Sequence, residues 1–339
     1  MNISDDSDMI SARLYPFTAT RQAADIRIGI LTIREKWKKI AERLSAPVPG
    51  FLAGNIVPSM DWVEWCSKGE QGKDMFADEN LVKIIARPWD IFKHNDWALR
   101  KDFELLTVGR QSQLIPSSNR TIAAENIFIE EGAIVEHSTL NASTGPIYIG
   151  KNAEVMEGCT IRGPFALCEG AVLKMGTKVY GATTIGSYCV AAGEIKNSVM
   201  FGYSNKAHDG YLGDSVIGEW CNLGAGTTNS NVKNTAGLVK IWSPVQQEFV
   251  PAGNKCGLLM GDYSRAAVNT AFNTGTLVGI CCNIFGEGFP PKFIPDFSWG
   301  KESYIYEKAL EDIGNWKKLK GHTLSSSEQE NLFRIYNKK

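Results

Sequence analysis

A polar segment, residues 193–231, contains the side chains best suited to chemistry in this sequence. Titratable and amide groups crowd within it, at Glu194, Lys196, His208, Tyr211, Asn222 and Asn231. The segment interrupts a regular repeat, and repeat proteins are stabilised by uniform stacking of their units. An interruption that concentrates such groups is therefore a candidate functional site. The alternative interpretation is a polar surface loop.

Two lysines could form an anion site beside this segment. Lys178 and Lys196 are eighteen residues apart. If one coil of the repeat contains three hexads, their ammonium groups lie above one another at about 4.8 Å, the spacing of neighbouring strands. Such groups repel each other, but an anion such as a sugar phosphate between them would make the pair favourable. The alternative is a pair of solvated lysines.

The element that must position these groups is a solenoid. An aliphatic residue recurs every six positions, at Ile149, Val155, Ile161, Leu167, Leu173, Val179 and Ile185. Four residues after each aliphatic comes a mostly small side chain, as a tight corner requires. Neither a helix nor an ordinary strand has a period of six, whereas a three-sided parallel β-coil does. The spacing predicts a left-handed parallel β-helix.

The repeat is broken in two places. Hexads begin with Ile129 and Val135, and an insertion at 141–145 precedes Ile149. After Ile185 the next clear hexads start at Ile217 and Leu223, so 32 residues separate two recognisable aliphatic positions. We expect a loop to leave the coil between them.

Three segments follow along the chain. Residues 1–113 mix short apolar runs with helical patterns, including a strand-then-helix pattern at 51–57 and 60–66, and predict a compact, shortened α/β domain. Residues 114–290 form the β-helix. Residues 291–339 predict a short helical tail, in which Ser325 and Glu328 have the spacing of a capping box.

Composition excludes several classes of partner. The formal net charge is -1, and no basic face is indicated that would favour nucleic acid or an anionic membrane. The N-terminal residues lack the apolar core of a signal peptide, and the longest apolar stretch, 277–285, is too short to span a bilayer. We expect a cytoplasmic enzyme. Cys159, Cys189 and Cys221 occupy hexad corners, where a thiol packs as a small hydrophobic group, and we expect no metal or redox role for them.

The segment YSNKAHDGYLGDSVIGEWCNLGAGTTNSN resembles the acetyltransferase site of the bifunctional N-acetylglucosamine-1-phosphate uridyltransferase/glucosamine-1-phosphate N-acetyltransferase family. Blocks from one end of the chain to the other resemble the variant bacterial branch of that family: RLYPFTATRQAADIRIGILTIREKW, RPWDIF, ENIFIEEGA, NTGTLVG and FGEGFPPKFIPDFSWG. The resemblance covers nearly the whole chain and implies a transferase of nucleotide-sugar biosynthesis.

The resemblance assigns roles to individual residues. It implies that His208 is the general base that deprotonates the attacking amine, with Glu194 orienting or assisting it, and that Asn222 lies beside the reacting acyl group. Backbone around Ala225 would contact acetyl-CoA. Four side chains would hold the amino-sugar phosphate: Lys178, Lys196, Tyr211 and Asn231. Members of the family form trimers whose clefts are completed by a neighbouring subunit, so a homotrimer is expected.

The sequence departs from the family pattern at the positions that bind the substrate phosphate. The family has an arginine where this chain has Lys178, and a further phosphate-binding lysine matches only loosely, to Lys233 or Lys240. Lysine neutralises a phosphate as a point charge but lacks the planar, bidentate donor pair of arginine.

Nucleotidyl transfer by the N-terminal domain is less well supported. The family's glycine-rich loop is missing, and the branch pattern offers Thr18, Thr20 and Arg21 as possible triphosphate contacts. A family Asp that binds Mg²⁺ corresponds to Asn55 in the stretch GNIVP. Mg²⁺ prefers anionic oxygen ligands, so it is expected only if nucleotidyl transfer is retained.

Three other interpretations remain. The N-terminal domain could retain uridylyl transfer, or the chain could be a non-catalytic scaffold derived from such an enzyme. A γ-class carbonic anhydrase uses the same coil but needs three histidines around zinc, and only His137 and His208 lie in the repeat.

Overall fold

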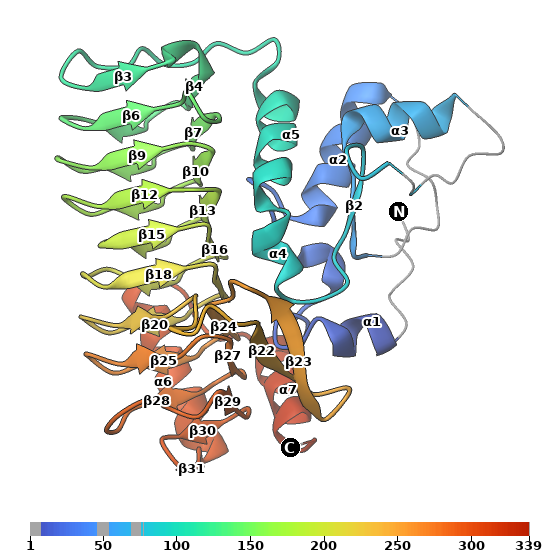
Figure 1. Ribbon diagram of the computed structural model, residues 1–339, viewed down its shortest axis with the longest axis vertical. Coiled ribbons are helices and arrows are strands. Elements are labelled where there is room, and N and C mark those ends of the chain that lie inside the picture. Colours follow the sequence, from blue (N-terminus) through green and yellow to red (C-terminus); the bar gives the residue numbers. More distant parts are fainter. Residues whose placement is uncertain (1–7, 46–53, 69–75, 77, 339) are drawn as a thin grey trace.

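The computed structural model describes residues 8–45, 54–68, 76 and 78–338, and it contains the predicted β-helix (Figure 1). Three parallel sheets form the three faces of the coil. The first face has nine strands: β4 (Ile127–Ile129), β7 (Ile147–Ile149), β10 (Phe165–Leu167), β13 (Thr183–Ile185), β16 (Val199–Met200), β19 (Val216–Ile217), β24 (Leu258–Met260), β27 (Thr276–Val278) and β29 (Phe293–Ile294).

The second face has ten strands: β5 (Ile134–Val135), β8 (Glu154–Val155), β11 (Val172–Leu173), β14 (Val190–Ala191), β17 (Asn205–Lys206), β20 (Asn222–Leu223), β25 (Arg265–Ala266), β28 (Asn283–Ile284), β30 (Ser298–Trp299) and β31 (Glu302–Ser303), the last antiparallel. The third face has six strands: β3 (Arg120–Ile122), β6 (Thr139–Asn141), β9 (Thr160–Arg162), β12 (Lys178–Tyr180), β15 (Glu194–Lys196) and β18 (Tyr211–Gly213). The pair β21 (Thr228–Asn229) and β26 (Ala271–Phe272) packs next to β18.

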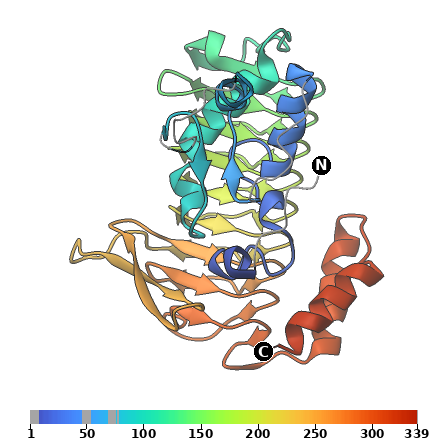
Figure 2. The same cartoon turned by 90° about the vertical axis from the view of Figure 1, so that its right-hand side faces the viewer.

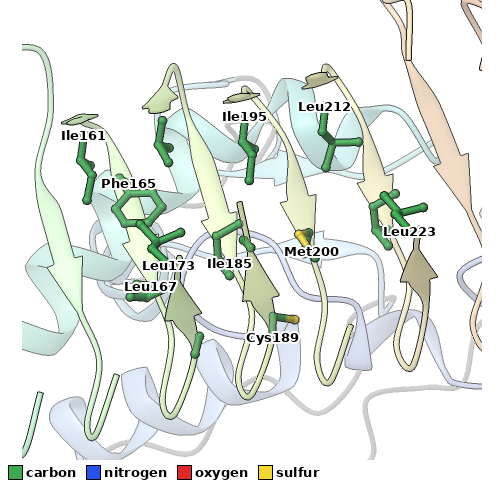
Figure 3. Close-up of a cluster of buried hydrophobic side chains, with 14 of the residues drawn as sticks. Ile161, Phe165, Leu167, Leu173, Ile185, Cys189, Ile195, Met200, Leu212 and Leu223 are labelled. Carbon is green, nitrogen blue, oxygen red and sulfur yellow. The ribbon is translucent and has the colours of Figure 1, made fainter. Parts of the chain in front are cut away.

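The aliphatic residues of the hexads point into the coil. All seven predicted positions, from Ile149 to Ile185, belong to one buried core, and Figure 3 shows Ile161, Leu167, Leu173 and Ile185 among its members. In this stretch Thr160 pairs with Lys178 and Val172 with Val190, so one coil is three hexads long. The prediction of a hexapeptide solenoid is confirmed.

The predicted loop between Ile185 and Ile217 is wrong, because the coil continues through these residues. Strands β14 to β18 lie in the three sheets without interruption. The inward positions after Ile185 are Ala191, Ile195, Met200, Lys206, Leu212, Ile217 and Leu223, and after Ala191 they are four, five, six, six, five and six residues apart. The strands keep their inward residues and the corners between them lose residues.

Further along, a real insertion leaves the coil between β21 and β24. It contains an antiparallel hairpin, β22 (Val239–Ser243) and β23 (Glu248–Gly253). Regular spacing then resumes at Met260, Ala266, Phe272, Val278 and Ile284, all buried in the same core. The sheets extend to Ser303, beyond the predicted end of the β-helix at residue 290.

The N-terminal segment is mainly helical and packs against the first face (Figure 1). Its elements are α1 (Asp8–Arg13), the 3-10 turn η1 (Ala23–Asp25), α2 (Ile33–Leu44), β1 (Ile56–Val57), α3 (Met60–Ser67), β2 (Lys83–Ile84), α4 (Asp90–Lys93) and α5 (Asn95–Thr107). A second 3-10 turn, η2 (Ala124–Asn126), precedes β4. The predicted strand-then-helix unit is present as β1 and α3, although residues 51–53 lie outside the described residues. The boundary at residue 113 stays a prediction.

A buried polar contact fixes this segment to the β-helix. Gly29 adopts a φ of 71°, which glycine tolerates without strain. Its N–H donates to Asn95 Oδ1 at 2.7 Å, and its carbonyl accepts from Thr184 Oγ1 at 2.9 Å. Beside it the buried Asp102 carboxylate pairs with Lys36 and accepts from the Ile30 N–H at 2.7 Å. The RIGIL stretch is therefore a docking loop.

Two C-terminal helices, α6 (Tyr306–Leu319) and α7 (Ser326–Tyr336), lie beside the far end of the coil (Figure 2). They pack against Trp220, Tyr263, Cys281 and Phe297, which stand in four successive coils at the corner between the first and second faces. The predicted capping box of Ser325 and Glu328 is confirmed. None of the helices in the described parts of the chain has the length and apolar character needed to cross a bilayer.

Candidate active site

The polar residues of strands β12, β15 and β18 form a cluster on the outer side of the third face. Lys178 is paired with Glu194, and Glu194 in turn with Tyr211. The predicted stacking of Lys178 on Lys196 is wrong, because Lys196 pairs with Tyr180 instead. The corner after Ala191 is two residues short, so this coil contains sixteen residues and shifts the register by two.

Tyr180 links the two charged residues of β15. Its hydroxyl donates to Glu194 Oε1 at 2.5 Å, and Lys196 Nζ lies 5.8 Å from the centre of its ring. The hydrogen bond to Glu194, together with burial, raises the pKa of Tyr180 to about 12. The phenol therefore stays protonated at neutral pH and holds the Glu194 carboxylate on the third face.

Tyr211 and Asn231 lie together, as the resemblance implies. Asn231 Nδ2 donates to the Tyr211 hydroxyl at 3.1 Å and also to Asp214. The other oxygen of Asp214 accepts from Asn197 Nδ2 at 2.6 Å. Burial and the Asp214 charge raise the pKa of Tyr211. Sequence reasoning missed Asp214, which follows a strand in a polar run that has no distinctive spacing.

His208 lies at the edge where the second face turns into the third, between β17 and β18. Its side chain is exposed and, within the part of the chain that the structure describes, its imidazole has no hydrogen-bond partner. Glu194 does not hydrogen-bond to it in the described residues; only the Glu194 backbone approaches this corner, donating to Gly210 O at 3.2 Å. The imidazole is thus free to bind a substrate group.

Lys206 is a component of this corner that sequence reasoning did not single out. Its ammonium is buried and donates to Ala192 O at 3.0 Å and to His208 O at 2.9 Å. Burial lowers the pKa of Lys206 to about 8.

Asn222 and Ala225 belong to the next coil. Asn222 is on the second face, paired with Asn205 on one side and Arg265 on the other. The corner that contains Ala225 lies directly above that of His208, since Gly226 N–H donates to Asp209 O at 3.1 Å. The structure therefore brings Ala225 to the same edge as His208, but no hydrogen bond joins Asn222 to His208 among the described residues.

Two hollows flank the cluster. One, of about 680 Å³, lies further along the edge that carries His208 and Ala225, and is lined by Thr270, Phe285, Gly286 and Phe289 among others. The other is a depression of about 370 Å³ on the third face, lined by Thr139, Thr160, Arg162 and Tyr180 among others. One hollow thus lies on the same edge as His208, and the other on the third face that carries Lys178 and Tyr180.

The residues predicted to contact a triphosphate are used within the chain. Thr18 Oγ1 donates to Ser11 O at 2.5 Å, and Thr20 donates to Asp262. Arg21 Nη2 pairs with Asp262 at 2.5 Å and with Glu219 at 3.2 Å. The Thr18 contact lies within the N-terminal segment, whereas those of Thr20 and Arg21 attach this segment to the β-helix, so the three side chains do not converge on an open site.

The Asn55 side chain does not fit a magnesium site. It is buried, and its Nδ2 donates to Ile85 O at 2.9 Å, across the pair β1–β2. Among the residues that the structure describes, no group of three His, Cys, Asp or Glu side chains could hold a metal ion.

Comparisons with known proteins agree with the motifs. Residues 2–56 match a family model described as a sugar nucleotidyl transferase. A bifunctional GlmU protein of Methanocaldococcus jannaschii is 30% identical over 198 residues, 58% of this chain and 42% of that protein. A bifunctional sugar-1-phosphate nucleotidylyltransferase/acetyltransferase of Sulfurisphaera tokodaii is 26% identical over 288 residues, 77% of this chain and 64% of that protein.

This chain thus spans about half the length of the curated relatives that it matches. An Arabidopsis UDP-N-acetylglucosamine acyltransferase is similar at a TM-score of 0.32 and 15% identity, covering 66% of this chain and 90% of that one. The resemblance to bifunctional GlmU proteins is confirmed by the sequence matches.

Proposed function

We propose that this chain transfers an acetyl group from acetyl-CoA to the amine of an amino-sugar phosphate such as glucosamine-1-phosphate. The observation that carries the proposal is the corner of His208. An exposed imidazole without an internal partner lies between a cationic, phenolic cluster on the third face and an edge that leads to a large hollow. The names of the matched relatives supply the reaction class.

The chemistry would run through this chain's own side chains. His208 accepts the proton of the amine as its nitrogen attacks the thioester carbon; the N–C bond forms, the C–S bond breaks and the thiolate leaves. Lys178 and Lys196 would neutralise the phosphate, with Tyr211 and Asn231 donating to the sugar. Asn222 would lie beside the acyl group as a donor for the developing oxyanion.

Glu194 fits a role on the sugar side better than the predicted one. Its carboxylate is bound by the Tyr180 hydroxyl on the third face, one strand from Lys178 and one from Tyr211. We propose that it orients Tyr180 and the neighbouring ammonium groups, and that His208 acts as base without it.

The acetyl-CoA would lie along the edge that carries Ala225. Asn269 N–H donates to Ala225 O at 2.7 Å, which stacks the next corner on this one, and the corner after that borders the 680 Å³ hollow. Thr270 and Phe285, two and three coil spacings of about 4.8 Å from the His208 corner, both line the hollow, a span suited to an extended pantetheine arm. Because the edge is open, we propose that a neighbouring subunit of a homotrimer covers it.

A direct assay tests the proposal. Purified protein is mixed with acetyl-CoA and glucosamine-1-phosphate, and release of free thiol is followed. Glucose-1-phosphate is the matched control, because it keeps the phosphate and lacks the amine. Thiol release that requires the amine supports acetyl transfer. Absence of release with a panel of amino-sugar phosphates would refute it and favour the scaffold interpretation.

A second candidate function is uridylyl transfer, favoured by the family-model match at residues 2–56. The contacts of Thr20, Arg21 and Asn55 within the chain count against it. Formation of pyrophosphate from UTP, Mg²⁺ and N-acetylglucosamine-1-phosphate would establish it, and a null result together with positive thiol release would assign the chain to acetyl transfer alone.

A further inference from the structure

A lysine occupies an inward position of the β-helix. Lys206 is the strand partner of Ala191, is 1% exposed, and stands between the inward residues Met200 and Leu212. Transfer of an ammonium group into an apolar core is costly unless hydrogen bonds satisfy it. We therefore look for a role of Lys206 other than filling the apolar interior of the coil.

The backbone pattern of the regular corners shows what is different around Lys206. At the corners between the second and third faces, the carbonyl two residues past the inward residue accepts from an N–H of the next coil. Three examples are His137 O from Gly158 N at 2.9 Å, Glu157 O from Gly176 N at 3.0 Å, and Ala225 O from Asn269 N at 2.7 Å. At these three corners a backbone N–H of the next coil thus satisfies the carbonyl.

The corner of His208 lacks that bond. The equivalent carbonyl is His208 O, but the next coil donates from Gly226 N to Asp209 O instead. The preceding coil is also unusual, because only three residues separate its inward positions Ala191 and Ile195. Its corner is therefore too short to stack under the full-length corner 207–210 of the His208 coil. The ammonium of Lys206 bridges both levels, donating to His208 O and Ala192 O.

We propose that Lys206 is a positioning residue that holds the His208 corner in place of the missing backbone bonds. It does not touch the reacting atoms. Hydrogen bonds from an ammonium group are stronger than those between neutral groups, so they fix the His208 backbone and with it the origin of the imidazole. The catalytic part of this inference rests on the proposed acetyl transfer; the structural part does not.

The test replaces the ammonium and keeps the length of the side chain. Lys206→Met removes both hydrogen bonds, and Leu223→Met is the matched control at a neighbouring inward position that is 2% exposed. Hydrogen–deuterium exchange of residues 207–210, the melting temperature, and kcat with KM are measured on each. Replacing a buried ion by an apolar residue is often neutral or stabilising, so we expect no fall in melting temperature.

In Lys206→Met we expect exchange at 207–210 to rise about tenfold, since two charge-assisted hydrogen bonds are lost. We expect kcat to fall about 10²-fold with KM for the amino sugar unchanged, because the base is misplaced while the phosphate site is intact. Lys206→Gln retains N–H donors and is expected to recover part of both effects. Leu223→Met is expected to behave like the wild type.

Three results would overturn the inference. Unchanged exchange at 207–210 would remove the structural part, whatever the activity. Raised exchange with unchanged kcat would remove the catalytic part. A melting temperature that falls in Lys206→Met and Lys206→Gln would assign the lysine to the fold. If the wild type itself releases no thiol, acetyl transfer fails, and the exchange data still decide whether Lys206 holds the corner.

Discussion

Two histidines occupy the same place in different coils, and their surroundings differ. His137 comes two residues after the inward Val135, and His208 two residues after the inward Lys206. Both side chains are exposed at the edge between the second and third faces. The carbonyl of His137 accepts from Gly158 N, and that of His208 from a lysine side chain. Position in the repeat therefore does not distinguish a structural histidine from a candidate base.

The polar neighbours distinguish them. The strand after His137 begins with Thr139, which pairs with Thr160, whereas the strand after His208 begins with Tyr211, which pairs with Glu194. In the regular coils the equivalent corner carbonyl accepts from a backbone N–H of the next coil. The shortened coils shift the register, and by doing so they bring Lys178, Glu194 and Tyr211 into one row. Loss of corner residues, rather than an inserted loop, assembles the candidate site.

The largest expected effect comes from exchanging the two histidines for alanine. His208→Ala is expected to lower kcat/KM for acetyl transfer by about 10²- to 10⁴-fold, the range for removal of a general base. His137→Ala is expected to leave it within about twofold, because the strand after His137 pairs Thr139 with Thr160 and has no counterpart of the Tyr211–Glu194 pair. Equal losses of kcat/KM in both variants, measured by thiol release, would show that His208 has no catalytic role that His137 lacks.

The buried ammonium of the shortened coils predicts a pH dependence of stability. The folded-state pKa of Lys206 is lowered to about 8, so between pH 8 and the ordinary lysine value near 10.5 the unfolded chain binds more protons than the folded one. Stability therefore rises with pH across this window, by about 3 kcal/mol from this group. Urea unfolding at pH 8 and pH 10.5 should show a rise in the free energy of unfolding of the wild type and a smaller rise in Lys206→Met. An equal change of this free energy with pH in both proteins would contradict the prediction.

Charge on the third face gives a smaller effect. Lys196→Ala is expected to raise KM for the amino-sugar phosphate about tenfold with little change in kcat, since one phosphate contact is lost. Lys151 is an exposed lysine of the regular coils, and Lys151→Ala is the matched control. Steady-state kinetics at two salt concentrations would check this, because screening should weaken the effect of Lys196. A KM that responds equally to both substitutions would place the phosphate elsewhere.

The smallest effect concerns the helices that cover the last coils. Partial burial alone would raise the pKa of Glu328, but hydrogen bonds from Lys317 and Ser325 lower it to about 2. The contribution of the ionised Glu328 to the free energy of unfolding is present above its ordinary pKa near 4.5, and it is lost as the pH falls from 4.5 through 2. Discounted for exposure, it is about 1 kcal/mol. The melting temperature of the wild type should fall more than that of Glu328→Gln over this range, and parallel curves would disprove the contribution.

The regular part of the fold could be predicted because its inward residues are aliphatic. Ile149 to Ile185 reveal their period directly, whereas Ala191 and Lys206 occupy inward positions without being recognisable as such. The four-residue step from Ala191 to Ile195 cannot be read from the sequence, because an alanine at the inward position before it is not recognisable as part of the repeat. The stacked lysines were a wrong prediction for the same reason, since the coil length was assumed to be constant.

The candidate site was predictable in part. The neighbourhood of Tyr211 and Asn231 followed from the resemblance, and the structure brings them within hydrogen-bond distance. Tyr180 could have been found, because it is two residues after Lys178 and alternate residues of a strand face the same side. The Asp214 carboxylate meets the amides of Asn197 and Asn231, and the Lys206 ammonium meets two backbone carbonyls, only because the shortened corners shift these groups together, and no sequence pattern reports that. Thr20 and Arg21 show the opposite error: the motif predicted a ligand site, but their side chains bind Asp262 of the same chain.

The way the N-terminal helices are packed has one more consequence. Their apolar side chains share a single core with Val199, Val216 and Leu259 of the first face. A fragment starting at residue 114 would leave that strip of the coil open to water, and we expect it to aggregate or to need detergent. For the same reason heat should melt the helices and the middle of the coil in one cooperative transition, so calorimetry of the intact chain should not resolve a separate early peak for residues 8–107.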